Sequence, residues 1–111
     1  MDVRVEPAGA SAAVVAPAGR LTMVTAGELT ATVERAVAAG RTVLVVDLAE
    51  TVFMDSSGLG ALVTGLRVAR AAGGDLRIAR ATEQVLTVLQ LTTMDRVLRP
   101  YTTVDEALGA G

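Results

Sequence analysis

The sequence predicts one α/β domain with a mixed, partly parallel sheet of four to five strands and about four helices. Three observations support this class. The 111 residues are 51% hydrophobic, which is enough to build one core. Segments with strand patterns alternate with segments of helical spacing. The apolar run at 41–48 does not alternate with polar residues, which is typical of a strand covered on both faces. We expect residues 1–111 to form this domain, with a short flexible tail at about 109–111.

An antiparallel hairpin is expected at the N-terminus. Val3 and Val5 alternate with polar residues, and the residues at 7–9 (Pro-Ala-Gly) favour a turn. A second apolar run follows at 13–16. Two such runs joined by a turn predict paired strands.

The first helix has the clearest start signal in the chain. Thr25 and Glu28 have the spacing of a capping box, and Val24 and Leu29 occupy the positions of a hydrophobic staple. Gly40 is expected to end the helix. The side chains predicted to face water are Glu28, Thr32 and Arg35, and those predicted to face the core are Leu29, Val33, Ala36 and Val37.

The remaining elements follow in alternation. They are expected as a central strand at 41–48, a turn at 49–55, a helix at about 58–72, a strand at 75–80, a helix at about 83–91, a short strand at Val97 and Leu98, and a final helix opened by a second capping box at Thr103 and Glu106.

The turn before the second long helix carries the most informative residues. They are Asp55, Ser56, Ser57, Gly58, Leu59 and Gly60. A carboxylate or hydroxyl there can cap the helix, which is the common use of such residues. Two consecutive serines exceed what one cap needs, and the two glycines cost about 1 kcal/mol each relative to Ala. The bare turn therefore suggests a hydroxyl that another protein can approach.

Small residues also recur along this second helix. They are Gly58, Ala61, Gly65, Ala69 and Ala72. This pattern fits either close packing against a helix or the sheet, or a smooth face for docking.

Composition excludes several classes of function. The net charge is -2, the pI is about 5.0 and Lys is absent, so we expect no nucleic-acid binding. Without His or Cys the chain cannot build a Ser-His relay or a disulfide, and we expect no enzyme activity, no catalytic residues and no bound metal or cofactor. No apolar run approaches the roughly 20 residues of a membrane span, and no leader pattern is present, so we expect a cytoplasmic protein without direct membrane insertion.

The run from Phe53 to Gly60, preceded by an apolar strand ending at Leu48, resembles the phosphorylation motif of STAS-domain anti-sigma factor antagonists. These proteins act in bacterial stress and sporulation regulation. The resemblance extends over nearly the whole chain. It includes Gly19-Arg20-Leu21 with Thr25 at the first helix, Gly73-Gly74-Asp75-Leu76 at a strand start, and the segment Leu89 to Met94.

The resemblance implies a partner switch. Ser56 matches the family's phosphoacceptor. In that family the unmodified antagonist binds an anti-sigma factor that is also an ATP-dependent serine kinase, and so releases a sigma factor. Phosphorylation abolishes this binding, and a manganese-dependent serine phosphatase restores it. ATP and Mg²⁺ would then belong to the kinase rather than to this chain.

The resemblance also implies a partner-binding surface formed by Asp55, Ser56, Ser57, Gly58, Leu59 and Gly60. Asp55 would shape the turn, Ser57 would cap or hydrogen-bond nearby, and Gly58 would keep the approach open. The chain departs from the family at Thr22 and Met23, where an acidic residue usually follows the Gly-Arg-Leu segment. An alternative function with the same fold is a STAS scaffold or subunit of a multiprotein stress-signalling or lipid-transport assembly. A monomer and a weak dimer both remain open.

Overall fold

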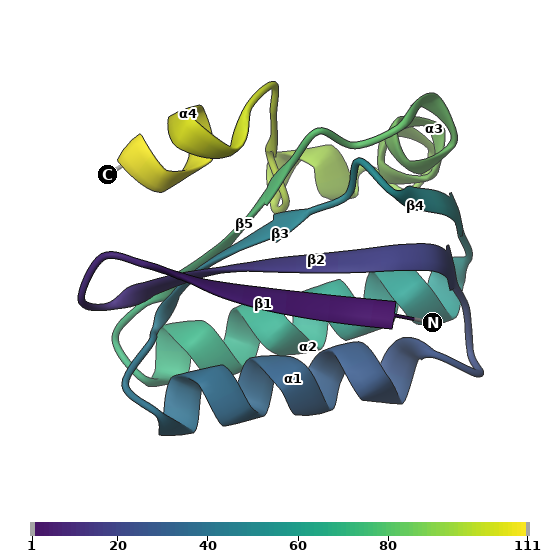
Figure 1. The fold of residues 1–111 in the computed structure, drawn as a ribbon. Coiled ribbons are helices and arrows are strands. Elements are labelled where there is room, and N and C mark those ends of the chain that lie inside the picture. The colour runs from purple at the N-terminus through teal and green to yellow at the C-terminus, as the bar shows by residue number, and fades with distance from the viewer. Residues whose placement is uncertain (1, 111) are drawn as a thin grey trace.

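Six strands form a mixed sheet in the computed structural model, which describes residues 2–110 (Figure 1). The main strand order is β1-β2-β3-β5-β6, and β4 pairs with β2 off this path. β1 and β2 are antiparallel and the other pairs are parallel. The strands span Asp2–Ala8 (β1), Ala12–Leu21 (β2), Val43–Asp47 (β3), Thr51–Met54 (β4), Asp75–Ala79 (β5) and Pro100–Tyr101 (β6). The predicted fold class and N-terminal hairpin are thus confirmed, with one strand more than expected.

Helices cover the sheet on both faces. α1 (Ala26–Ala38) and α2 (Ser56–Ala71) lie side by side against one face, and α4 (Val104–Gly109) lies across the other, over β3 and β5 (Figure 1). α3 (Glu83–Leu91) packs against β4 and is followed by a 3-10 turn, η1 (Met94–Arg96). Among residues 2–110, no helix has both the length and the hydrophobicity needed to cross a membrane.

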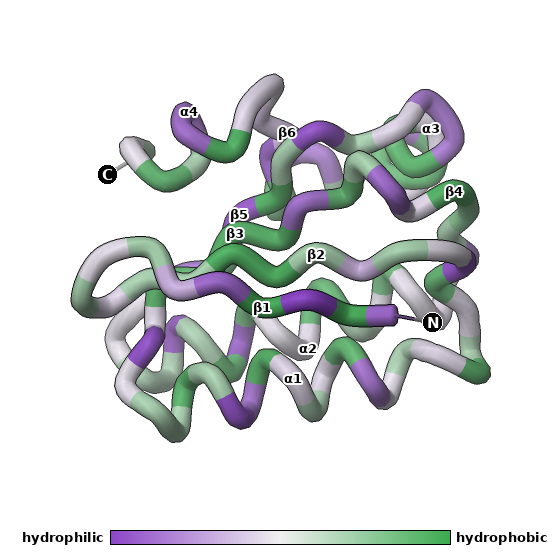
Figure 2. The backbone as a smooth tube through the Cα atoms, viewed as in Figure 1, coloured by the Kyte–Doolittle hydropathy of each residue, from purple (hydrophilic) through white to green (hydrophobic). Residues whose placement is uncertain are grey.

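The position of β3 in the sheet explains why its residues are hydrophobic without alternation, as Figure 2 shows. Leu44 and Val46 are fully buried in the core under α1 and α2. Val45 points the other way and is fully buried in a smaller cluster with Ala79 and Ala107 of α4. Because both faces of β3 are covered, alternation is unnecessary, as the sequence predicted.

The predicted capping box of α1 is wrong. The Thr25 hydroxyl makes no cap bond to the helix. It accepts a hydrogen bond from the Thr22 N–H at 2.9 Å and donates one to the Arg20 carbonyl at 2.7 Å. Thr25 therefore fixes the loop between β2 and α1 instead of the first turn of the helix.

Two further expectations for α1 are also wrong. Val24 is 89% exposed, so it forms no hydrophobic staple with Leu29. Thr32 is buried rather than facing water, and its hydroxyl donates to the Glu28 carbonyl at 2.8 Å. This back-bond satisfies the hydroxyl within the helix, which lets a polar residue lie on the buried face.

The second half of the chain holds one confirmation and one correction. The Thr103 hydroxyl accepts from the Glu106 N–H at 3.1 Å, so the predicted cap of α4 is present. The expected strand at Val97 and Leu98 is wrong, because the Leu98 N–H bonds to the Met94 carbonyl within a turn. The strand pairing with β5 is β6, two residues later. The tail was expected at about 109–111, but Gly109 is the last residue of α4; Ala110 follows it in an extended conformation, and Gly111 lies outside the described residues.

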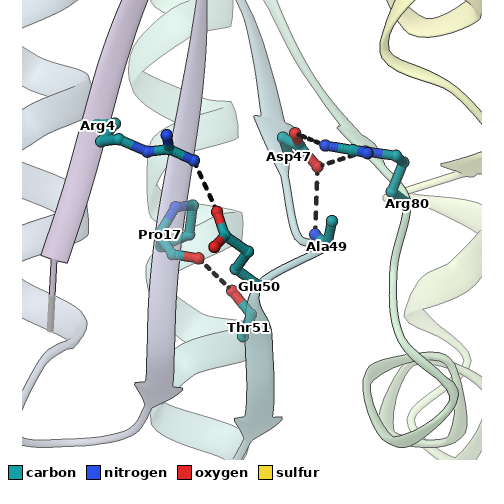
Figure 3. Close-up of polar contacts among 7 residues, drawn as sticks. All are labelled: Arg4, Pro17, Asp47, Ala49, Glu50, Thr51 and Arg80. Atoms are coloured by element: carbon teal, nitrogen blue, oxygen red, sulfur yellow. Dashed lines mark hydrogen bonds and ion pairs between the residues drawn. The ribbon is translucent and has the colours of Figure 1, made fainter.

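An ion pair between the nearly buried carboxylate of Asp47, at the end of β3, and the exposed guanidinium of Arg80, directly after β5, joins these two strands (Figure 3). Both oxygens of the Asp47 carboxylate accept from the Arg80 guanidinium, at 3.0 and 2.6 Å, and one also accepts from the Ala49 N–H at 3.2 Å. Burial alone would raise the pKa of Asp47. The bonds from Arg80 and Ala49 and the positive charges of Arg80 and Arg4 outweigh burial and lower this pKa.

We predict that Asp47→Asn destabilises the domain at neutral pH, because the amide offers donors where Arg80 needs acceptors. Because the native pKa of Asp47 is lowered, its contribution is present above the unfolded value of about 4 and is lost as the pH falls through the native value. Urea unfolding of both proteins between neutral pH and pH 3 should show a difference in unfolding free energy that shrinks on acidification. The exposed Glu34→Gln change is the matched control. A difference independent of pH would contradict this account.

Candidate functional site

α2 begins at Ser56, two residues earlier than the sequence predicted, and Asp55 is its cap. The Asp55 backbone is extended, and one of its carboxylate oxygens accepts from the Gly58 N–H at 3.0 Å. Asp55, Ser56 and Ser57 could each have capped the helix, and the Asp55 carboxylate is the group that does so. Among residues 2–110, the hydroxyls of Ser56 and Ser57 make no hydrogen bond.

The predicted acceptor is exposed. Ser56 is exposed in the first position of α2, whereas Ser57 is half-buried. Among the described residues, no backbone or side-chain acceptor binds the N–H group of either serine. The first turn contains no acidic side chain. These orphan N–H groups and the positive end of the helix dipole favour a negative group at this position.

The residues predicted to bind a partner divide into two groups. Ser56 and Gly60 are exposed, and Asp55 and Ser57 are partly exposed. Gly58 and Leu59 are buried. The buried pair shapes the turn but offers little surface to another protein.

Gly58 has a different role from the one expected. A Cβ atom there would lie 2.3 Å from the Leu21 carbonyl oxygen and 2.9 Å from Cγ of Met54. The Leu21 carbonyl also accepts from the Asp55 N–H at 3.3 Å. The glycine therefore lets the first turn of α2 pack against the end of β2, and the expectation that it keeps the approach open is wrong. Gly60 has open space around its Cα and does leave the surface bare.

The small residues of α2 serve packing rather than docking. Gly58, Ala61, Gly65 and Ala69 are buried, and Ala72, which follows the helix, is exposed. A Cβ at Gly65 would lie 2.9 Å from Leu76 of β5 and 3.5 Å from Val33 of α1. The small side chains thus allow α2 to lie close to both the sheet and α1, and the alternative of a smooth docking face is excluded.

Gln84 of α3 holds the strand that leads into the site. Its side-chain oxygen accepts from the Met54 N–H at 2.8 Å, and its amide nitrogen donates to the Met54 carbonyl at 2.9 Å. Thr82 donates to the Thr51 carbonyl at 3.2 Å. These side chains occupy the edge of β4 that β2 leaves open. The role of Gln84 was not predicted from the sequence, because 49–55 was expected to be a turn. A turn has no strand edge whose backbone groups need hydrogen-bond partners.

Exposed apolar side chains lie on the loop after β2. Met23 and Val24 are 77% and 89% exposed. They follow Leu21, whose carbonyl accepts from the Asp55 N–H in the turn at 55–60, which we call the acceptor turn after the predicted role of Ser56. The guanidinium of Arg20, on β2, lies 4.4 Å from the centre of the ring of Phe53, on the neighbouring strand β4. An exposed apolar loop therefore begins two residues after the residue that contacts this turn.

The site does not resemble the catalytic centre of a hydrolase. A nucleophilic serine needs a base within hydrogen-bond reach. The carboxylate adjacent to Ser56 is that of Asp55, which is bound to the Gly58 N–H. The Asp55 carboxylate thus serves as the cap of α2 rather than as a base for Ser56.

Comparison with protein families gives an independent result. The model of the STAS domain matches residues 5–107. A Thermotoga maritima protein named as a candidate anti-sigma factor antagonist is 34% identical over 61 residues, which are 55% of this chain and 54% of that protein. In that match the chain spans about half the length of the curated relative.

Solved structures share the whole fold. An anti-sigma factor antagonist from Mycobacterium paratuberculosis has a TM-score of 0.85 at 28% identity, covering 98% of this chain and 92% of that chain. The anti-sigma factor antagonist SpoIIAA in its unphosphorylated form has a TM-score of 0.81 at 22% identity, covering 96% and 93%. Its phosphorylated form, from Bacillus, has a TM-score of 0.74 at 20% identity, covering 96% of each chain. The SpoIIAA likeness shows the fold.

We predict opposite effects for two glycines in the first turns of α2. Gly58→Ala should lower the free energy of unfolding by about 1–3 kcal/mol, because its methyl group would overlap the Leu21 carbonyl. Gly60→Ala should raise it by up to about 1 kcal/mol through helix propensity, since nothing obstructs its Cβ. Urea unfolding of both variants measures this. Equal effects would show that α2 does not pack closely against β2.

We also predict that Gln84→Ala loosens the acceptor turn. Loss of two hydrogen bonds to Met54 should cost about 1–2 kcal/mol and should speed amide exchange at Met54 and Asp55. Gln90→Ala, at an exposed position of the same helix, is the control and should change neither. Unchanged exchange in Gln84→Ala would show that the clamp does not hold the turn.

Proposed function

This chain belongs to the STAS domain family, and on that premise we propose that it is an anti-sigma factor antagonist switched by phosphorylation of Ser56. The unphosphorylated form binds an anti-sigma factor that is also a serine kinase, and a sigma factor is released. Phosphorylation abolishes this binding, and a serine phosphatase restores it. The observation that carries the proposal is the exposed hydroxyl of Ser56 at the N-terminus of a helix already capped by Asp55.

The hydroxyl of Ser56 can be modified without loss of a structural contact. It forms no hydrogen bond with residues 2–110, and the cap is supplied by the neighbouring carboxylate. Ser57 is half-buried and follows one residue inside the turn. A kinase therefore has the better approach to Ser56, and the ATP and Mg²⁺ for the transfer come with the kinase.

A phosphate on Ser56 should leave the fold almost unchanged. It adds a charge of about -1.5 to -2 at pH 7. The orphan N–H groups and the helix dipole favour this charge by about 0.3–1 kcal/mol, while the Asp55 carboxylate opposes it. SpoIIAA, which has the same fold, is described in both an unphosphorylated and a phosphorylated form. The switch therefore acts on the surface presented to the partner.

The neighbouring loop explains how such a charge could prevent binding. Met23 and Val24 present apolar surface beside the acceptor turn, and a partner that covers them also removes water from Ser56. Burying a phosphate without a compensating cation is costly. A penalty of about 4 kcal/mol would weaken binding a thousandfold. Because Thr22 and Met23 replace the usual acidic residue, we infer that apolar contact dominates at this loop and that it influences which kinase is recognised.

We predict that incubation with a cognate kinase and ATP adds one phosphate, as measured by the intact mass of the chain. Ser56→Ala should abolish the addition, because it removes the exposed acceptor. Ser57→Ala is the matched control and should retain it. Modification lost only in Ser57→Ala would move the acceptor to Ser57, and no modification by any anti-sigma factor kinase would contradict the proposal.

The binding half of the switch is tested with Ser56→Asp. Its affinity for the anti-sigma factor should fall at least a hundredfold, while its thermal unfolding midpoint stays within a few degrees of the parent. A large change in the midpoint would show that the charge acts on the fold. Stoichiometric copurification with a large assembly, with or without ATP, would instead support the scaffold or subunit function.

A further inference from the structure

Four arginines converge far from the acceptor turn. They line a hollow of about 150 Å³ between the end of α2, the start of β5 and the segment from η1 to β6. The arginines are Arg70, Arg77, Arg96 and Arg99, and the single carboxylate among the lining residues is Asp75. We call this hollow the arginine groove. Its local charge of +3, four arginines less one aspartate, contrasts with the net charge of -2 of the chain.

Two of the four arginines are held by contacts within the domain. The Asp75 carboxylate accepts from Nε of Arg70 and from Nε of Arg77, each at 3.3 Å. Arg77 also donates to the Ala107 carbonyl at 3.0 Å, and its side chain is only 14% exposed. Arg77 is therefore fixed, whereas the side chain of Arg70 is 61% exposed and is held by one ion pair. This half of the arginine groove shows a carboxylate lying between two guanidinium groups.

The other two arginines lack such a partner. Arg96 and Arg99 are exposed, and within residues 2–110 neither makes an ion pair or a side-chain hydrogen bond. The guanidinium carbon of Arg99 lies 6.0 Å from the centre of the Tyr101 ring. Val97, between them in the chain, is 45% exposed and lines the same hollow. The arginine groove thus combines two guanidinium groups that have no ion-pair partner among residues 2–110 with an apolar side chain and an aromatic ring.

We propose that the arginine groove binds an acidic segment of a partner protein. Carboxylates of the segment would pair with Arg96 and Arg99, as Asp75 pairs with the other two arginines. The planar guanidinium group suits carboxylates because it can donate two parallel hydrogen bonds. An apolar side chain of the segment would lie against Val97 and Tyr101. Arg and Tyr are residue types that contribute most to binding at protein interfaces.

This surface is separate from the proposed phosphorylation site. Ser56 begins α2 and Arg70 lies in its last turn, so the two are about 21 Å apart along the helix. The arginine groove and the acceptor turn therefore lie at opposite ends of one helix. The inference does not depend on the proposed function, since it uses none of the residues of the acceptor turn.

The test uses a synthetic hexapeptide of Asp and Glu with one central Leu, titrated into the ¹⁵N-labelled full chain. Saturable shifts are expected at Arg96, Val97, Arg99 and Tyr101. The double variant Arg96→Gln/Arg99→Gln should weaken binding at least tenfold. Arg67→Gln, at an exposed α2 position outside the hollow, is the matched control and should bind like the parent. A peptide of Asn and Gln around the same Leu should not bind.

Other results would overturn the proposal. Absence of saturable shifts with the acidic peptide would show that the arginines form only a solvated edge. Saturation by inorganic phosphate or by a short single-stranded RNA, without binding of the peptide, would assign the surface to a different ligand. Equal losses in Arg67→Gln and in the double variant would show attraction to overall charge rather than to the arginine groove.

Discussion

The close approach of α2 to the end of β2 determines where Ser56 lies. Gly58 permits this approach, because any side chain there would overlap the Leu21 carbonyl. On the opposite edge of β4, the amide of Gln84 takes both hydrogen-bonding groups of Met54. The acceptor turn is therefore fixed by β2, β4 and α3, which are far apart in the sequence. Because three elements hold the backbone of this turn, Ser56 is presented at the same place to every protein that approaches it, which is the preorganisation that a specific interaction needs.

Asp55 and Ser56, which are neighbours in this turn, have different roles. The Asp55 carboxylate accepts a hydrogen bond from a helix N–H group, so the Ser56 hydroxyl is not needed as the cap of α2. If the serine were the cap, its modification would remove the cap and disturb α2, at a cost of about 1 kcal/mol. With the carboxylate as cap, a charge can be added or removed while the helix stays intact. The consecutive serines that seemed excessive for a cap thus make sense when neither of them caps the helix.

The sequence predicted those features that depend on local pattern. The hairpin, the doubly covered strand β3 and helix α3 follow from periodicity, and the exposed Ser56 follows from the spacing of the turn. Features that depend on tertiary contacts were missed or wrong. β4 is only four residues long and depends on β2 and Gln84 for its hydrogen bonds. Thr25 has the spacing of a cap, yet loop carbonyls and amides compete successfully for its hydroxyl. The sequence does not reveal that Gly58 is buried, because Leu21, against which it packs, lies 37 residues earlier in the chain.

The two ends of α2 attract opposite charges, and the distance between them is long enough for salt to screen one end from the other. At the N-terminus, the helix dipole and orphan N–H groups accept an added negative group, and at the C-terminus Arg70 complements the opposite end of the dipole. Between them, small residues pack the helix against α1 and β5, which holds the ends at a fixed separation of about 21 Å. This separation exceeds twice the Debye length of about 8–10 Å at physiological ionic strength. A charge gained at Ser56 is therefore largely screened at the arginine groove. If Ser56 is phosphorylated as proposed, one end of α2 would gain charge while the other keeps its cationic surface, and a partner bound at the arginine groove need not be released together with a partner at the acceptor turn.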